Sequence, residues 1–437
     1  MFKTLAFIVL LLGGVSEEEV GQRVRELSHP SVVTRNAAEQ ALIQMGPEAL
    51  PFLPAASPSA EARLRLSRIR IQLEKQKSAD SLEAGRIVLS QKATLNEVLS
   101  EIQKQTHNEI FTTTDGSILL EPTEGSGLSF WEYVDRVCDA HRLTLQSRGR
   151  EAAWYFVPSR RATPRHADKN PLAAYMGPFR LEATKITSST LLENRVTSTQ
   201  IQLDLGWEPR IRPIFGQLTL VGASFVKSSG ETQDATSALQ KRIHEIPFGA
   251  KEIRASMDIP VPLTPAATES MRAYDFLSLR GHFSAVAASE TIDFKFESLD
   301  QKLNREFSPV SHRTAALLTT LSSLRSEKIA APDGSVKEYL IAGLRYRYEN
   351  SYDAMESHRT WIYENNASLV CATTSERLES ERSELLRQTS NEIAAEIYIP
   401  IPPSFHENVR DWTLIFPRPG GLYQVEYEFE IKGVPIP

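Results

Sequence analysis

Residues 424–432 read QVEYEFEIK, and every second side chain in this stretch is apolar. The apolar side chains are Val425, Tyr427, Phe429 and Ile431, and the glutamates between them are Glu426, Glu428 and Glu430. Successive side chains of a β-strand point to opposite faces of its sheet. The alternation therefore predicts an antiparallel strand with one buried face and one face in water.

The same period of two recurs throughout residues 175–437. It is clearest at 201–207, at 292–296 and at 340–348, and no long helical period interrupts these strands. Antiparallel sandwich domains need about 100 residues each. We therefore predict two β-sandwich domains at 175–300 and 313–437, with a seam near 300–312 in the polar stretch LDQKLNREFSPVSHR.

Upstream of these sheets the chain repeats one pattern of polar and apolar residues. Residues 93–111, ATLNEVLSEIQKQTHNEIF, and residues 128–146, LSFWEYVDRVCDAHRLTLQ, align at an offset of 35. Both copies begin with an N-terminal capping box, Thr94 with Glu97 and Ser129 with Glu132. Short β-rich runs flank both helices, so we predict an α+β module of order βαββαβ, closed by one more strand, over 84–158.

This module resembles the STN domain, the short N-terminal module of secretins and TonB-dependent receptors. The resemblance rests on "ATLNEVLSEIQKQTHNEI" and "LSFWEYVDRVCDAHRLTL". It implies a location in the periplasmic part of an envelope machine and a role in protein–protein contacts. No outer-membrane barrel or secretin-ring sequence follows, so a transport role does not carry over.

Residues 17–78 contain helical signals separated by proline-rich breaks. In the last helix Ala62, Leu66, Ile69 and Leu73 form one apolar stripe. The stretches "HPSVVTRNAAEQALIQMGPEALPFLPAA" and "SAEARLRLSRIRIQLE" resemble HEAT-type helical repeats. We expect a small all-α cap here, because one or two such repeats cannot form a long solenoid.

The first sixteen residues, MFKTLAFIVLLLGGVS, have the three parts of a secretory signal peptide: a basic start, an apolar run and small residues. We therefore expect an exported protein, periplasmic or extracellular, with no integral membrane span after cleavage of the leader at 1–16. The two cysteines, Cys138 and Cys371, fall in different predicted domains. We expect two small buried side chains, although an oxidising compartment leaves pairing open.

The basic run at 159–170, SRRATPRHADKN, lies in a predicted linker at 159–174. A solvated linker is the favoured interpretation, and a phosphate or glycan patch through its arginines is the alternative. The net charge of -6 argues against nucleic-acid binding. The chain has no H-E-x-x-H, C-x-x-C, G-x-S-x-G or P-loop motif, so we predict no catalytic, cofactor-binding or metal-binding residue and no enzyme.

One candidate binding edge remains, at 206–216, GWEPRIRPIFG. Prolines after an alternating strand stop sheet pairing, so Trp207 could stack a sugar while Arg210 and Arg212 grip a carboxylate. The alternative is a strand that crosses between sheets, with the arginines covering Trp207.

The sequence therefore predicts an exported, non-enzymatic binding or scaffold protein of the bacterial envelope, with envelope proteins as partners. Binding or hydrolysis of cell-wall glycan is the alternative. The segments "RTWIYENNASLV" and "YEFEIKGVPIP" also resemble the C-terminal region of exported bacterial proteins that carry HEAT-like segments. That resemblance implies no activity.

Overall fold

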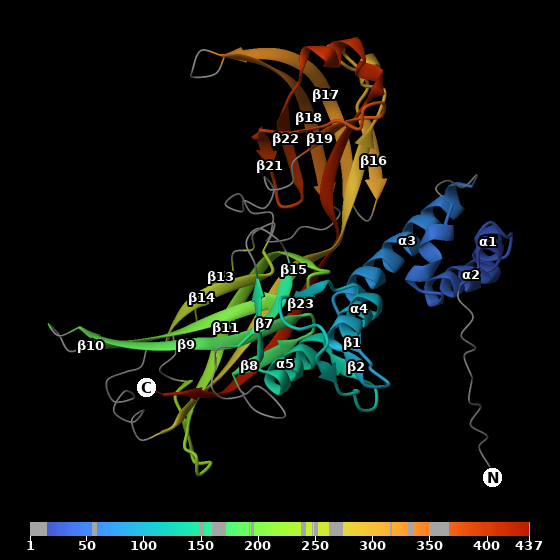
Figure 1. The fold of residues 1–437 in the computed structure, drawn as a ribbon. Coiled ribbons are helices and arrows are strands. Elements are labelled where there is room, and N and C mark those ends of the chain that lie inside the picture. The colour runs from blue at the N-terminus through green and yellow to red at the C-terminus, as the bar shows by residue number, and fades with distance from the viewer. Residues whose placement is uncertain are drawn as a thin grey trace, which may run out of the picture. The chain divides into compact units, whose positions relative to one another are not determined.

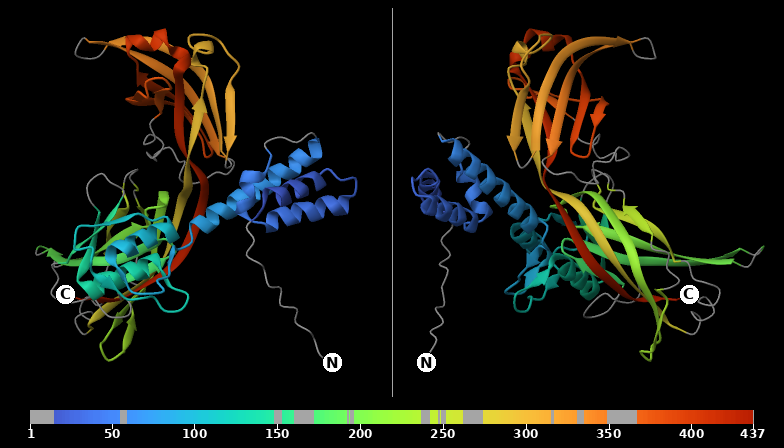
Figure 2. Two further views of the ribbon diagram at one scale, coloured as in Figure 1. Left: turned by 45° about the vertical axis from the view of Figure 1, so that its right-hand side comes forward. Right: turned by 180° about the vertical axis from the view of Figure 1, so that it is seen from behind.

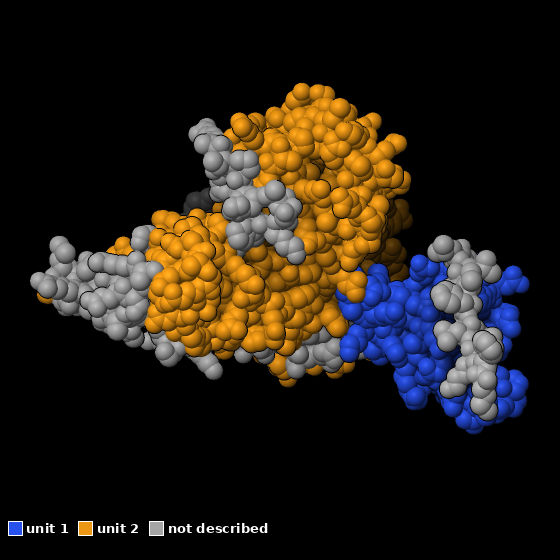
Figure 3. Space-filling model, turned by 90° about the horizontal axis from the view of Figure 1, so that it is seen from below, with its two compact units in different colours: residues 1–80 blue, residues 81–437 orange. Residues whose placement is uncertain are grey.

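The computed structural model contains two compact units, residues 1–80 and 81–437 (Figures 1 and 3). It describes residues 15–54, 59–147, 153–159, 172–191, 193, 196–236, 242–246, 248, 252–261, 274–314, 317–330, 335–348 and 367–436. Most of the predicted leader, most of the predicted linker and residues 359–366 lie outside these ranges. Within them no helix is both long and apolar enough to cross a bilayer.

The first unit is helical, as the sequence predicts. Its elements are α1 (Glu17–Glu26), α2 (Val32–Gln44), a 3-10 helix (Pro47–Phe52) and α3 (Ala60–Ser81). The predicted stripe of α3 is confirmed, because all four of its residues are buried in the core of this unit. One arginine of α3 lies off the stripe and is not simply solvated: Arg65 bridges Glu39 and Glu61.

The two predicted capping boxes are both present in the second unit. Thr94 and Glu97 cap α4 (Leu95–Thr106), and Ser129 and Glu132 cap α5 (Phe130–His141). Each helix also ends at a residue with positive φ, and these residues, His107 and Arg142, are again 35 positions apart. The repeat therefore extends to the backbone conformation that ends each helix.

The short strands around these helices pair crosswise between the two copies. The first strand of each copy pairs with the second strand of the other, and the last strands of both copies flank one shared central strand. The pairs are β1 (Arg86–Ile87) with β5 (Leu128–Ser129), β2 (Ala93–Thr94) with β4 (Leu119–Leu120), and β3 (Ile110–Thr112) and β6 (Leu143–Ser147) with β7 (Trp154–Pro158). Each copy thus supplies strand partners that the other lacks, which gives the repeat a physical reason.

The rest of the described chain is β-rich and antiparallel. One sheet has the order β14 (Arg254–Val261), β10 (Val196–Trp207), β9 (Phe179–Leu191), β8 (Ala173–Met176). A second has the order β12 (Thr232–Asp234), β11 (Arg212–Val226), β15 (Phe276–Phe296), β23 (Trp412–Pro435), β19 (Ser368–Cys371), β20 (Arg377–Glu379), with β13 (Ile243–Ile246) also on β11. A third has the order β16 (Val310–Thr314), β17 (Leu317–Ala330), β18 (Val336–Tyr348), β22 (Glu392–Pro400), β21 (Arg382–Gln388).

Strands β15 and β23 pair along almost their whole length and belong to two hydrophobic cores (Figure 2). Odd-numbered side chains near one end lie in the first core, with the α+β module and the four-stranded sheet. Even-numbered side chains near the other end lie in the second core, with the five-stranded sheet. The odd set includes Leu279, Phe283, Phe429 and Ile431, and the even set includes Phe294, Phe296, Leu414 and Phe416.

We call this shared pair of strands, β15 and β23, the ribbon. Because it belongs to both cores, the predicted domain boundary at 300–312 is wrong. Residues 300–312 do not separate two sandwiches, because the second core contains Ile214, Val286 and Phe294 from the first predicted domain. In the other direction β23 returns from the second core to the first. The local alternation predicted each strand correctly, but it carries no information about which core a strand joins.

Substituting Gly281 with alanine is expected to destabilise the protein by about 2–3 kcal/mol, because overpacking forces neighbouring groups apart. Gly281 lies on β15 opposite Phe429, and a Cβ added there would lie 2.4 Å from the Phe429 ring and 2.6 Å from the carbonyl oxygen of Thr219. Denaturant unfolding of the purified chain measures the loss. Ser284→Ala, on the same strand but only half-buried, should stay close to the parent; equal effects of both variants would refute the steric argument.

Candidate functional site

Trp207 does not lie on an exposed edge. Its side chain is 1% exposed, and its ring packs edge-on against Phe248 with 5.0 Å between the centroids. Its carbonyl oxygen accepts a hydrogen bond from the indole of Trp154 at 3.1 Å. A ring buried in this way cannot stack on a sugar, so the first interpretation of the candidate edge is wrong for this residue.

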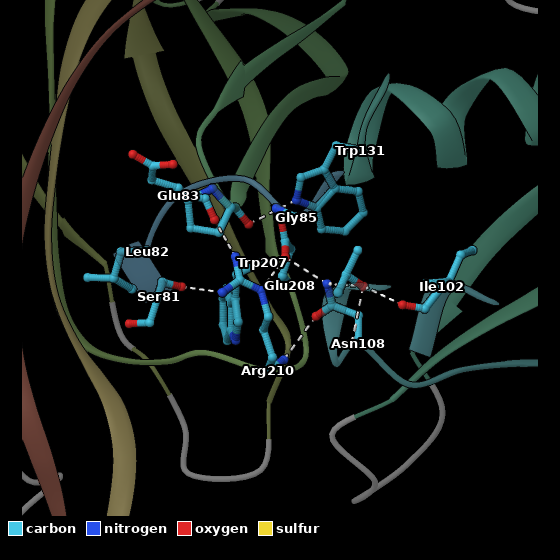
Figure 4. A network of polar contacts seen from close by, with 12 residues as sticks. Ser81, Leu82, Glu83, Gly85, Ile102, Asn108, Trp131, Trp207, Glu208 and Arg210 are labelled. Atoms are coloured by element: carbon cyan, nitrogen blue, oxygen red, sulfur yellow. Dashed lines mark hydrogen bonds and ion pairs between the residues drawn. The ribbon is translucent and has the colours of Figure 1, made fainter. Parts of the chain in front are cut away.

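Arg210 is also used inside the protein (Figure 4). Its Nε donates to the Glu208 carboxylate at 2.6 Å, and its two terminal nitrogens donate to the carbonyl oxygens of Ser81 and Glu83. Arg212 opens β11 opposite Ala288 and is half-buried. The predicted pair of arginines is therefore divided between two different environments.

The centre of this network is Glu208, which is fully buried. Its carboxylate accepts hydrogen bonds from the Gly85 amide at 2.8 Å and from the Asn108 side-chain amide at 2.7 Å, besides the Arg210 bond. The Asn108 side-chain oxygen, Oδ1, in turn accepts from the Arg210 backbone amide at 3.1 Å. We call these residues, Gly85, Asn108, Glu208 and Arg210, the junction network. It joins the α+β module to the end of β10.

Sequence reasoning missed Glu208 and Asn108. Nothing in the local pattern marks either one, because each makes contacts with residues about 100 or more positions away. A buried carboxylate needs a cation and hydrogen-bond donors around it. Here the donors come from three separate stretches of chain.

Beside the junction network lies a small polar cleft between the α+β module and the four-stranded sheet. Its water-accessible volume is about 100 Å³. The described residues that line it include charged groups from both walls: Asp135, Asp139, Arg142, Arg180, Glu182, Asp204 and Arg254. Gly206 forms part of the floor, where a Cβ would lie 3.1 Å from the ring of Trp154 and 3.4 Å from that of Trp131.

Arg180 links the two walls of the cleft. Its Nε donates to Asp135 on α5 at 2.8 Å, and its Nη1 donates to Glu182 on β9 at 2.8 Å. Tyr175 also donates to Asp135, at 2.7 Å. Burial acts to lower the pKa of Arg180, but the Asp135 and Glu182 carboxylates outweigh burial and hold this pKa above its usual range. Burial, reinforced by Asp135, likewise raises the pKa of Tyr175.

Asp204 completes the inner part of the cleft and is less well satisfied. Its Oδ2 lies 3.8 Å from the guanidinium of Arg254, whose side chain is 45% exposed. Its Oδ1 is buried, with less than 1 Å² accessible, and has no hydrogen-bond partner among the described residues. Because a buried oxygen without a donor is costly, the Asp204 carboxylate would gain from an additional donor.

Cys138 of α5 also lines the cleft, whereas Cys371 lies in the second core. Neither forms a disulfide. Hydrogen bonds from Thr373 and Thr374 lower the pKa of the Cys371 thiol to about 7. Among the described residues, no three histidine, cysteine or acidic side chains gather in a way that could hold a metal ion.

Comparisons with known proteins do not assign the chain to a family. No family model matches it, and no curated protein does. Among solved structures, it is weakly similar to the C-terminal globular domain of an oligosaccharyltransferase from Pyrococcus abyssi, at 9% identity and a TM-score of 0.15. That alignment covers 71% of this chain and 56% of the other, and likeness at this level carries no argument about fold or function.

Proposed function

We propose that this chain is an exported, non-enzymatic binding or scaffold protein of the bacterial periplasm or envelope, which acts through protein–protein contacts. In this proposal the N-terminal helices are HEAT-like, the module at 84–158 is STN-like, and the β-rich remainder forms two sandwiches that share the ribbon. The leader-like pattern of the first sixteen residues supports export.

The polar cleft is the observation that carries the proposal. The junction network and the Arg180 ion pairs hold its two walls together, so a ligand would meet a preformed site. Sites for small organic ligands usually enclose about 300–1,000 Å³. A volume of about 100 Å³ is better suited to one protruding side chain of a protein than to an oligosaccharide.

Photo-crosslinking in the native host tests this proposal. A photoreactive amino acid at Arg254, at the rim of the cleft, is expected to give a discrete crosslinked product that contains an exported envelope protein. The same residue at Glu430, exposed on β23, is the matched control. Products that are identical at both positions, or their absence from both, would count against a binding role for the cleft.

Export has its own test. The mature protein is expected to lack the leader and to fractionate outside the cytoplasm, which N-terminal sequencing of the purified native protein would measure. A native protein that retains Met1 and stays in the cytoplasm would end the envelope proposal, whatever the cleft binds.

A further inference from the structure

The unsatisfied Oδ1 of Asp204 has no donor within its own sheet. In the register of the strands, Asp204 lies between Glu182 on β9 and Ser256 on β14. Two like charges directly opposite each other on neighbouring strands repel. Arg180 pairs with Glu182, whereas Asp204 has the longer contact to Arg254, at 3.8 Å.

One row further along the sheet, a glycine separates two arginines of the cleft. Arg180, Gly206 and Arg254 face one another there, and the glycine contributes no side chain between the two arginines. The buried rings of Trp131 and Trp154 lie directly over Gly206. A group that enters the cleft therefore meets a charged lining that includes the Asp204 carboxylate.

We propose that the cleft receives one cationic side chain of the partner, an arginine or a lysine, whose N–H groups donate to the Asp204 carboxylate. This inference rests on the proposed protein-binding function and names the chemistry of its contact. Arg254, half-exposed and only loosely paired, moves toward solvent when the cation enters.

The charges of the cleft favour a cation over an anion. The buried cation, Arg180, is already held by two carboxylates, so it has little attraction left for a third. A bound anion would also lie against Asp204 and its neighbour Glu182. A cation instead neutralises a carboxylate whose buried oxygen has no other donor, and such charge-assisted hydrogen bonds are the strong ones.

Ligand-observed NMR with the purified chain tests the inference, with methylguanidinium, methylammonium and acetate as probes at equal ionic strength. Methylguanidinium or methylammonium is expected to show saturable binding, and acetate none. Asp204→Asn keeps the shape of the side chain and should weaken binding by about tenfold or more, because a charged hydrogen bond is lost. Glu430→Gln, on an exposed face, should leave it unchanged.

Arg254→Ala is a second test, in which cation binding should change in the opposite direction to that in Asp204→Asn. Because the arginine competes for Asp204, its removal should strengthen cation binding several-fold; in an anion site it would abolish acetate binding instead. Saturable acetate binding, or full cation binding by Asp204→Asn, overturns the inference. If no cation binds while crosslinking at Arg254 still captures a partner, the inference of a cationic ligand is refuted and the proposed protein-binding function stands. Cation binding without a crosslinked partner confirms the chemistry of the cleft and counts against the function.

Discussion

Replacing Glu208 with alanine is expected to lower the free energy of unfolding by about 3–5 kcal/mol, the usual cost of removing one partner from a buried ion pair. The loss follows because Arg210 would keep its charge without its carboxylate, and the Gly85 amide and the Asn108 side chain would lose their acceptor. Denaturant unfolding followed by tryptophan fluorescence is the measurement. Three of the five tryptophans, Trp131, Trp154 and Trp207, lie beside this network.

Glu430→Ala is the matched control for this prediction. Glu430 lies on β23, is exposed, and forms a surface ion pair with Lys432 at 2.9 Å. Surface pairs of this kind contribute about 0–1 kcal/mol. If both variants unfold at the same denaturant concentration, the junction network does not hold the module to the sheet, and the walls of the cleft are not fixed by it.

Replacing Phe416 with alanine is expected to cost about 3–5 kcal/mol, as for other large buried rings, and to loosen the first core as well as the second. Phe416 is fully buried in the second core, 5.7 Å from the ring of Tyr346, and it lies on β23. Because the ribbon belongs to both cores, losing its packing at one end should release both ends together.

Hydrogen exchange measured by mass spectrometry can show whether the Phe416 substitution loosens both cores or the second core alone. Peptides from β10, in the first core, and from β18, in the second, should lose protection in the same cooperative step. Leu386→Ala, at a side chain that is 62% exposed on β21, should leave both peptides protected. Faster exchange in β18 alone would mean that the two cores are independent domains.

The local structure of this protein is largely predictable from its sequence. The capping boxes at Thr94 and Ser129 and the alternation at 201–207 and 340–348 are statements about neighbours a few residues apart, and the structure confirms them. Such patterns decide the type of an element because capping and strand alternation are local properties.

The site was much less predictable, because it depends on residues that are distant in sequence. Pro209 indicates the end of a strand after Trp207, but it does not show that the α+β module covers that end. Pro213 lies within β11, opposite Ala287, and does not stop pairing there. Arg180, Asp135 and Asp204 come from three elements, and none stands out alone. The predicted domain boundary at 300–312 was wrong for a related reason. Alternation within a strand shows which face is buried, but it does not show which other elements that face packs against.

Because odd-numbered side chains of the ribbon face the first core and even-numbered ones the second, only some changes in its length preserve both cores. Deleting one residue of β15 between Ala287 and Ile292 would turn every following side chain to the opposite face, so that Phe294 and Phe296 would point into water. A deletion or insertion of two residues would keep the faces and alter only the spacing. Within a lineage of such proteins, the distance between the two cores should therefore vary in steps of two residues.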